Sequence, residues 1–462
     1  MIMPDEDRSL IITPESAAAL ADAAASFFKS RELAGGRVLL ALKNSTAFAA
    51  ALLGGFKAGL DMVLVEHGSV SDIQKAMELT GAPAVVAEEE HHDELSSCSA
   101  VLMHPEEFAS GGTQVSSALR LPRSGNYVLF TSGSTGGPRG VVYSLERIRP
   151  ELESLKGILL LKNGETVTSL VSWCHIYGLH AGLLAPLDAG CSVRIADEAA
   201  PARMLELMHA EVSDVVLLTP AQLRPLGTLA MARERRSYSR LASSGAHLAD
   251  DVSKVWRDTL DVRIMDIYGS TEAGGVAYRA GQTVFSPFEH VECSIRPGKR
   301  GSEESSPDEL FVRSPVSSVS VLGQGGEESG LLDDDGFLAT GDAVEKAENG
   351  FVLIGRIDGI VKLGGRRVSL HEIEKTIMST GLAGDAVAWM HKRGSGHERE
   401  LWAAVLPAAS DTDEIGRRLR EKLPPYRRPR RIVALESFPG TRPGKISIEM
   451  LDSEAVRAGG RG

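Results

Sequence analysis

The sequence predicts an α/β fold, with a large N-terminal body of helix-covered β-sheets followed by a smaller C-terminal domain. Three observations lead to this expectation. Short apolar runs alternate with helical stretches over most of the chain, which is typical of parallel sheets covered by helices. From about Val291 the apolar runs shorten and polar connectors appear, which indicates a β-rich subdomain. At 462 residues the chain is also too long for a single hydrophobic core.

The alternation of strands and helices begins near the N-terminus. Thr13 can cap a helix over residues 15–30, and Pro14 fits the first turn of that helix. The next predicted strands are 37–44, 62–67 and 83–89, and the helices between them are 47–59 and 72–81. The same rhythm returns in the apolar runs 166–172, 192–196, 214–219 and 262–269. We therefore expect parallel sheets with helices on their faces.

The composition is that of an ordinary soluble enzyme. Hydrophobic residues make up 43% of the chain and charged residues 24%. The net charge of −12 argues against a protein that binds duplex DNA. The first ten residues are acidic where a signal peptide would be basic, and Lys57 and Asp61 interrupt the best apolar run. The four cysteines form no CxxC pair, which fits a reducing cytoplasm. With the charge and the interrupted apolar run, this predicts a cytoplasmic protein with no membrane or nucleic-acid partner.

Charge is unevenly distributed along the chain. Residues 1–358 hold 31 basic and 49 acidic side chains, whereas residues 359–462 hold 19 and 13. A net charge of about −18 is thus followed by one of about +6, which indicates two bodies with different roles. Solvated surface charge without a specific role would explain the same numbers.

The segment TSGSTGGPRG, residues 131–140, lies between two apolar runs that are typical of buried strands. It is either a flexible linker or a backbone that binds something polar. The phosphate-binding pattern GxxxxGK[ST] and the dinucleotide pattern GxGxxG are both absent around it, so the two common nucleotide folds lose support. Glycines and hydroxyls can still offer donors to phosphate oxygens, and Arg139 adds a permanent cation. The flanking strands favour a phosphate-binding loop.

TSGSTGGPRG resembles the phosphate loop of the AMP-forming adenylating enzymes, the superfamily of acyl-CoA synthetases, peptide-synthetase adenylation domains and firefly luciferases. Further segments resemble the other signatures of this superfamily and follow in its order over residues 127–445. These segments are WCHIYGL (173–179), SSGAHL (243–248), DIYGSTEAGG (266–275), DGFLATGD (335–342), GRIDGIVKLGGRRVSLHEIE (355–374), LPPYRRP (423–429) and PGTRPGK (439–445). One such motif could arise by chance, but the ordered series is specific.

The resemblance implies a reaction in two steps. A carboxylate attacks the α-phosphate of ATP and releases pyrophosphate, and a thiol then attacks the resulting acyl-adenylate. ATP and Mg²⁺ would be the cofactors, and the thiol would belong to coenzyme A or to the phosphopantetheine of an acyl carrier protein. Residues 1–357 would form the large domain that binds ATP and the acid, and residues 358–462 a small, mobile α+β domain.

The resemblance also assigns an ATP site. Thr131, Ser132, Ser134 and Thr135 would hold the β- and γ-phosphates, with Arg139 where the superfamily usually has lysine, and Gly133 and Gly136 of the same loop would also bind ATP. The residues on the adenine side would be Ser244, Gly245, Ala246, Asp266, Gly269 and Tyr268, of which Tyr268 would stack on the base. Asp342 would accept the ribose hydroxyls beside Arg356. Thr271 would reach the α-phosphate, and Glu272 would hold Mg²⁺, because a hard cation prefers carboxylate.

The remaining assignments concern the reacting groups. Lys445 would bridge the attacking carboxylate and the α-phosphate, Asp358 would be the hinge, and Gly365 would approach the thiol. The acid pocket would be lined by Trp173, His175, Tyr177, Gly178 and Gly274. The segment around His175 holds no carboxylate to pair an α-amine, so we expect an acid without an α-amino group. His175 could equally be a core histidine. The segment resembles aryl or acyl acid ligases, and the short N-terminal part favours a small or flat acid.

Two other functions remain open at this point. A luciferase-like relative would stop at the adenylate or transfer it elsewhere. A non-catalytic relative would bind nucleotide as a regulator, although the joint presence of Glu272, Asp342 and Lys445 disfavours this. The arginines of RRPRR, residues 427–431, would either contact nearby acids such as Glu436 or meet an acidic partner. That partner would be the 3′-phosphate of coenzyme A or the surface of a carrier protein.

Overall fold

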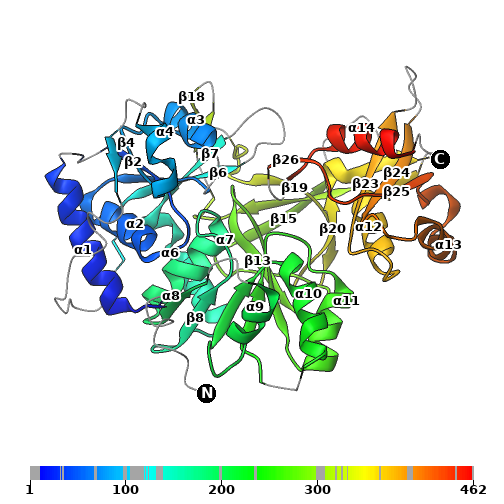
Figure 1. Cartoon of the computed structure of the whole chain (residues 1–462), viewed down its shortest axis with the longest axis horizontal. Helices are drawn as coiled ribbons and strands as arrows, with labels where there is room; N and C mark the ends of the chain where they lie inside the picture. Colours follow the sequence, from blue (N-terminus) through cyan, green and yellow to red (C-terminus); the bar gives the residue numbers. More distant parts are fainter. Residues whose placement is uncertain are drawn as a thin grey trace. The chain divides into compact units, whose positions relative to one another are not determined.

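The computed structural model describes residues 11–31, 33, 36–66, 70–96, 101–104, 119, 121–122, 124–131, 139–196, 200–233, 237–297, 307–317, 320–323, 326–329, 331–363, 366–392, 399–442 and 445–459. These residues form β-sheets covered by helices, so the predicted α/β class is confirmed (Figure 1). By contacts, the chain separates into two compact units. The first is Met1–Ser294 with Phe311–Thr340, and the second is Ile295–Leu310 with Gly341–Gly462. The expected boundary at 357/358 stays a prediction.

The first sheet of unit 1 has the strand order β18-β17-β7-β6-β3-β2-β4-β5. Its strands are β2 (Arg37–Ala41), β3 (Asp61–Leu64), β4 (Ala84–Ala87), β5 (Val101–Met103), β6 (Asn126–Thr131), β7 (Arg139–Ser144), β17 (Ser320–Gly323) and β18 (Gly326–Ser329). The pairings β4–β5, β2–β4, β2–β3 and β3–β6 are parallel, whereas β6 and β7 pair antiparallel. The carboxyl ends of the parallel strands therefore lie at one edge.

Helices α1 (Pro14–Ser30), α2 (Thr46–Ala58) and α3 (Val70–Thr80) belong to this part of the chain. The predicted N-terminal cap of α1 is present, because Oγ1 of Thr13 accepts a hydrogen bond from the backbone N–H of Ser16 at 3.2 Å. Helices α1 and α2 lie side by side at the blue end of Figure 1. A Cβ at Gly54 would collide with Cβ of Ala24 on α1, so glycine permits this close packing.

The second sheet of unit 1 has the order β1-β9-β8-β10-β11-β12-β13-β14. Its strands are β1 (Ile11–Ile12), β8 (Thr166–Ser169), β9 (Ser192–Ile195), β10 (Val215–Leu218), β11 (Arg240–Ser243), β12 (Ile264–Ser270), β13 (Gly274–Ala280) and β14 (Ser286–Pro287). Neighbours from β9 to β12 in this order pair in parallel, as the apolar runs predicted. Strand β13 returns antiparallel to β12.

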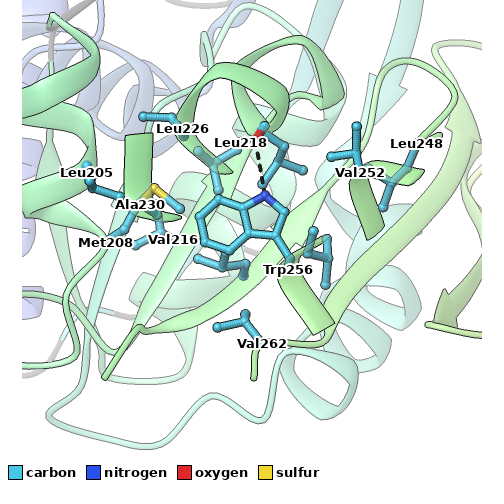
Figure 2. Close-up of a cluster of buried hydrophobic side chains, with 13 residues drawn as sticks. Leu205, Met208, Val216, Leu218, Leu226, Ala230, Leu248, Val252, Trp256 and Val262 are labelled. Atoms are coloured by element: carbon cyan, nitrogen blue, oxygen red, sulfur yellow. Dashed lines mark hydrogen bonds between the residues drawn. The ribbon is translucent and has the colours of Figure 1, made fainter. Parts of the chain in front are cut away.

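Helices α9 (Pro201–Leu207), α10 (Pro220–Met231), α11 (Asp250–Lys254) and the π-helical turn η4 (Val255–Thr259) follow strands of this sheet. Trp256 of η4 is fully buried among leucine and valine side chains of the sheet and its helices (Figure 2). Its indole Nε1–H donates to the carbonyl oxygen of Leu223 at 3.0 Å, which satisfies the one polar group of the ring (Figure 2).

The short helices η2 (Glu89–His91) and α4 (His92–Leu95) lie between β4 and β5, and the longer α6 (Leu145–Ile158) lies between β7 and β8. The chain after β8 forms α7 (Ile176–Leu179), a π-helical turn η3 (His180–Leu184) and α8 (Ala185–Asp188). The β-rich region expected from Val291 consists of β15 (Glu292–Pro297), β16 (Asp308–Arg313), β19 (Leu338–Ala347) and β20 (Gly350–Arg356), which form a sheet in the order β15-β16-β19-β20. No helix within the described ranges is long and apolar enough to cross a membrane.

The C-terminal part of unit 2 is built around the sheet β23 (Asp385–Lys392), β24 (Arg399–Leu406) and β25 (Arg431–Ala434). Alternate residues of β24 enter different cores: Leu401, Ala403 and Val405 pack with helices α12 (Leu370–Met378) and α13 (Thr412–Lys422). Trp402 and Ala404 pack instead with helix α14 (Ile448–Gly459). The connecting elements are η5 (Ile357–Gly359), β21 (Ile360–Leu363), β22 (Arg366–Ser369), η6 (Pro425–Arg427), β26 (Gly440–Arg442) and β27 (Lys445–Ile446).

Candidate functional site

The carboxyl edge of the second sheet gathers the predicted segments of unit 1. Because β8, β10, β11 and β12 run in parallel, their carboxyl ends lie at the same edge. Segment 173–179 follows β8, segment 244–246 follows β11, and the turn with Thr271 and Glu272 follows β12. Ligands of α/β proteins bind outside the carboxyl ends of such strands. The three segments, distant in sequence, therefore share one candidate site.

The first sheet also contributes to this site. Asn44 follows β2, and its side chain accepts from the backbone N–H of Trp173 and donates to the carbonyl oxygen of Val171, both at 2.8 Å. Glu66 follows β3, and its Oε1 lies 3.2 Å from Nε2 of His175. Segment 171–175 is thus bound to the carboxyl ends of parallel strands from both sheets of unit 1.

The residues predicted to line an acid pocket lie in different surroundings. Trp173 is fully buried against Phe48, with the ring centroids 5.6 Å apart. The side chain of His175 is 58% exposed, so the interpretation of His175 as a core histidine is wrong. Its hydrogen bond to Glu66 raises the pKa of His175.

Burial raises the pKa of the Tyr177 hydroxyl, which therefore stays neutral. A Cβ at Gly178 would collide with the carbonyl oxygen of Ser172, so only glycine fits there.

The strands expected on both sides of the phosphate loop are confirmed. β6 and β7 form an antiparallel pair in which Thr131 stands opposite Arg139. Most of the predicted phosphate-binding residues, namely Ser132, Gly133, Ser134, Thr135 and Gly136, lie outside the described residues. Arg139 is exposed at the base of this loop. Strand β6 pairs in parallel with β3, so its last residue, Thr131, lies at the carboxyl edge of the first sheet.

The predicted adenine-side residues follow β11 and end β12. Ser244 is buried, and Gly245 has a φ of +90°, which favours glycine. Ala246 is the next residue of this turn. The ring of Tyr268 lies 5.8 Å from that of Phe285. A Cβ at Gly269 would collide with the carbonyl oxygen of Gly274 across the hairpin, so glycine is needed where β12 bends.

Asp266 forms a buried ion pair that was not predicted from the sequence. Nε of Arg279 donates to Oδ2 of Asp266 at 2.8 Å, and the two residues face each other across β12 and β13. The side chains are 8% and 6% exposed. Arg279 also donates to the carbonyl oxygen of Leu248 at 3.0 Å. The pair fixes the start of the hairpin that carries Thr271 and Glu272, while a contact of Asp266 with ATP stays a prediction.

Among the residues at the carboxyl edge of the second sheet, Glu272 is the best candidate for a metal ligand. It lies half-buried in the turn between β12 and β13 and makes no hydrogen bond or ion pair with any residue that the structure describes. Within the same ranges no three His, Cys, Asp or Glu side chains cluster as a metal site would require. Mg²⁺ is commonly held by one or two carboxylates together with substrate phosphates. Glu272 fits that mode.

Unit 2 holds the predicted ribose pair. Asp342 of β19 stands opposite Arg356 of β20, and Nη1 of Arg356 lies 3.4 Å from Oδ1 of Asp342. Asp342 is buried, whereas 56% of the Arg356 side chain is exposed. Asp358 lies in η5, and Lys445 begins β27 opposite Arg442, but neither side chain is described. Gly365 lies outside the described residues.

Replacing Asp342 with alanine is expected to raise the KM for ATP with little change in the selectivity for acids. The reason is that a carboxylate accepts both hydroxyls of a ribose, a contact the acid substrate does not make. Steady-state kinetics over a range of ATP and acid concentrations measure both quantities. Glu345→Ala, which removes an exposed carboxylate from the same strand, serves as the control. A change in acid selectivity with an unchanged KM for ATP would assign Asp342 to the acid pocket.

Several arginines of RRPRR interact with other residues of unit 2 through hydrogen bonds, an ion pair and an aromatic contact. Nη1 of Arg427 lies 3.1 Å from Oε2 of Glu372, so the acidic neighbour is Glu372 and not the expected Glu436. Arg428 donates to the carbonyl oxygens of Leu423 and Arg420. The guanidinium of Arg431 lies 5.0 Å from the centre of the Trp402 ring. These contacts explain much of the cluster within unit 2.

A set of buried polar residues next to the Glu272 turn was not predicted from the sequence. Tyr127, Tyr143, Glu151 and His180 are all at most 3% exposed and come from β6, β7, α6 and η3. One signal was available: Glu151 falls on the apolar stripe of α6, between Ile148 and Leu155. A carboxylate on a buried helix face needs a partner, and that partner could not be read from the local sequence.

Comparisons with known proteins agree with this geometry. A model of the family described as AMP-binding enzyme matches residues 9–309. Over 348 residues the chain is 29% identical to anthranilate–CoA ligase of Pseudomonas aeruginosa, which covers 71% of this chain and 66% of that protein. Over 331 residues it is 22% identical to 3,4-dihydroxybenzoate–[aryl-carrier protein] ligase of Bacillus anthracis, with coverage of 71% and 73%. Other relatives are longer, and the chain spans only 21% of one and 60% of another.

The fold has a close counterpart among solved structures. A benzoate CoA ligase from Burkholderia xenovorans LB400 superimposes with a TM-score of 0.80 at 20% identity, over 95% of this chain and 94% of that one. At this level of identity the likeness shows that the two chains share a fold.

Proposed function

Because the chain belongs to the AMP-binding enzyme family, we propose that it activates a carboxylic acid with ATP and transfers the acyl group to the thiol of coenzyme A. The family inferred from the motifs is thereby confirmed, and its members include ligases for coenzyme A and for carrier proteins. The observation that carries the proposal is the common edge shared by segments 173–179 and 244–246 and the Glu272 turn.

The first step brings together two anions, so the site must provide positive charge and oriented donors. The acid carboxylate forms a bond to the α-phosphorus of ATP, and the bond to the pyrophosphate leaving group breaks. Arg139, exposed beside the phosphate loop, would face the polyphosphate, and Lys445 would bridge the attacking carboxylate and the α-phosphate. Glu272 would hold Mg²⁺, which when bound neutralises charge on the phosphate oxygens. In the second step a thiol displaces AMP.

For the acid we propose an aryl or short acyl acid without an α-amino group. His175 is the exposed polar side chain of segment 171–175, and its raised pKa favours the imidazolium form. The carboxylate that raises this pKa is that of Glu66, so the charge of the imidazolium is already paired and does not by itself select between acids with and without an α-amino group. The names of the relatives support the aryl class, because they refer to anthranilate, benzoate and 3,4-dihydroxybenzoate. The relative from Bacillus anthracis favours a second acceptor, a carrier protein.

A pyrophosphate-release screen tests the proposal. Aryl, short acyl and α-amino acids are offered with ATP and Mg²⁺, each without acceptor, with coenzyme A and with a phosphopantetheinylated carrier protein. We expect release with aryl or short acyl acids and thioester formation with coenzyme A. Thioester formed only on the carrier protein would select the second acceptor. If no acid in the panel causes pyrophosphate release, the proposed function is wrong.

Replacing Glu272 with glutamine is expected to lower turnover and to raise the Mg²⁺ concentration needed for half-maximal rate. The amide keeps the shape of the side chain but removes the charge that a hard cation prefers. Turnover is measured over a Mg²⁺ titration, and partial recovery at high Mg²⁺ is expected. Glu289→Gln, at an exposed position of the same unit, is the control. Equal activity of the wild type with and without any divalent ion would exclude the metal role.

A further inference from the structure

Three buried residues of unit 1 form a chain of hydrogen bonds. The hydroxyl of Tyr127 bonds Nε2 of His180, and Nδ1 of His180 lies 2.9 Å from Oε1 of Glu151. His180 is fully buried and the Glu151 side chain is 4% exposed. Each ring nitrogen of His180 thus has one hydrogen-bond partner, the hydroxyl of Tyr127 at Nε2 and the carboxylate of Glu151 at Nδ1. The chain is therefore a hydroxyl, an imidazole and a carboxylate in sequence.

Tyr143 connects this chain to the turn that carries Glu272. Its ring stacks on that of Tyr127, with centroids 5.3 Å apart and an angle of 10° between the planes. Its hydroxyl donates to the backbone carbonyl oxygen of Thr271. Burial raises the pKa of Tyr143, and the nearby charges of Glu151 and Glu272 raise it further. Tyr143 is thus a neutral and permanent donor to this turn.

Glu151 reaches the other end of the same turn. A Cβ at Gly274 would lie 2.5 Å from Oε2 of Glu151, and one at Gly275 would lie 3.2 Å from Oε1. Gly274 also has a φ of +78°, which favours glycine. The carboxylate therefore packs on the backbone just after Glu272, while Tyr143 holds the backbone just before it.

We propose that Tyr127, Tyr143, Glu151 and His180, here called the tyrosine–histidine cluster, are positioning residues that fix the Thr271–Glu272 turn for its work on the metal and the α-phosphate. This inference rests on the proposed function. The cluster joins the two strands that flank the phosphate loop to segment 176–184 and to the Glu272 turn. Polar groups are costly to bury and apolar residues often replace them without loss of stability, so packing alone gives little reason for this cluster.

The principal test is Tyr143→Phe, which removes one hydroxyl and leaves the stacked ring. We expect kcat for pyrophosphate release to fall by about tenfold or more and the Mg²⁺ requirement to rise, because the turn loses its fixed donor. Thioester formation from a supplied acyl-adenylate should change little, since it uses neither metal nor pyrophosphate. Tyr278→Phe is the matched control, because its hydroxyl on β13 makes no hydrogen bond with the described residues. Circular dichroism checks that the variants are folded.

A double-mutant cycle separates positioning from packing. If Tyr143 acts through Glu272, then Tyr143→Phe should cost much less in the Glu272→Gln background than in the wild type. Tyr127→Phe, which removes the hydroxyl that bonds His180, provides a second cycle with the same expectation. Additive effects in both cycles, or equal slowing of both half-reactions, would overturn the proposal. If the wild type releases pyrophosphate while the variants give these outcomes, only the positioning role is rejected and the proposed function stands. If the wild type releases no pyrophosphate, the proposed function itself is rejected.

Discussion

Replacing Lys445 with alanine is expected to lower the rate of pyrophosphate release by about 10²-fold or more, because the variant loses the cation between two anions that must meet. Thioester formation from a supplied acyl-adenylate should remain largely intact, since the lysine serves the first step. Both half-reactions are measured separately, the first by pyrophosphate release and the second by thioester yield.

The position of Lys445 favours this role over an ordinary surface lysine. It begins β27, whose backbone pairs antiparallel with β26, and it directly follows Pro443 and Gly444 in the sequence. Lys392→Ala is the matched control, because Lys392 is an exposed lysine of the same unit. The first-step role of Lys445 is rejected if Lys445→Ala releases pyrophosphate at the wild-type rate, or if both half-reactions are slowed equally.

Local patterns predicted much of the fold because they arise from local physics. The cap at Thr13 and the apolar strands on both sides of the TSGSTGGPRG segment needed only neighbours in sequence, and both are present. The common edge of the candidate site could also be predicted in part from the sequence, since parallel strands bring their carboxyl ends together. The hydrogen bond of His175 could not be predicted, because its partner Glu66 lies 109 positions earlier in the chain.

Contacts across strands explain the rest of what was missed. Asp266 was assigned to nucleotide from its motif alone, but its partner Arg279 is set by the register of β12 with β13. Glu151 and His180 meet because α6 and η3 pack together, which no spacing in the sequence reveals. Buried charges of this kind are informative: each must have a partner, and finding the partner requires the fold.

Replacing Arg279 with leucine is expected to destabilise unit 1 by about 3–5 kcal/mol, because the substitution leaves the Asp266 carboxylate buried without its partner. Arg279→Leu also removes the donor to the Leu248 carbonyl oxygen, which lies in the Trp256 core (Figure 2). Chemical denaturation followed by circular dichroism measures the loss. Arg257→Leu is the control, because Arg257 pairs with Asp258 at the surface and a surface pair contributes little.

The double variant Asp266→Leu with Arg279→Leu decides what this ion pair does. A pair of buried charges costs much to desolvate, so removing both should restore a large part of the stability that either single variant loses. The strong coupling expected between the two positions is measured as the departure from additivity. If Asp266 instead serves ATP alone, Arg279→Leu will match Arg257→Leu in stability, and only Asp266 substitutions will raise the KM for ATP. Recovery in the double variant would show that the carboxylate of the DIYGSTE segment anchors the hairpin on which Thr271 and Glu272 are held.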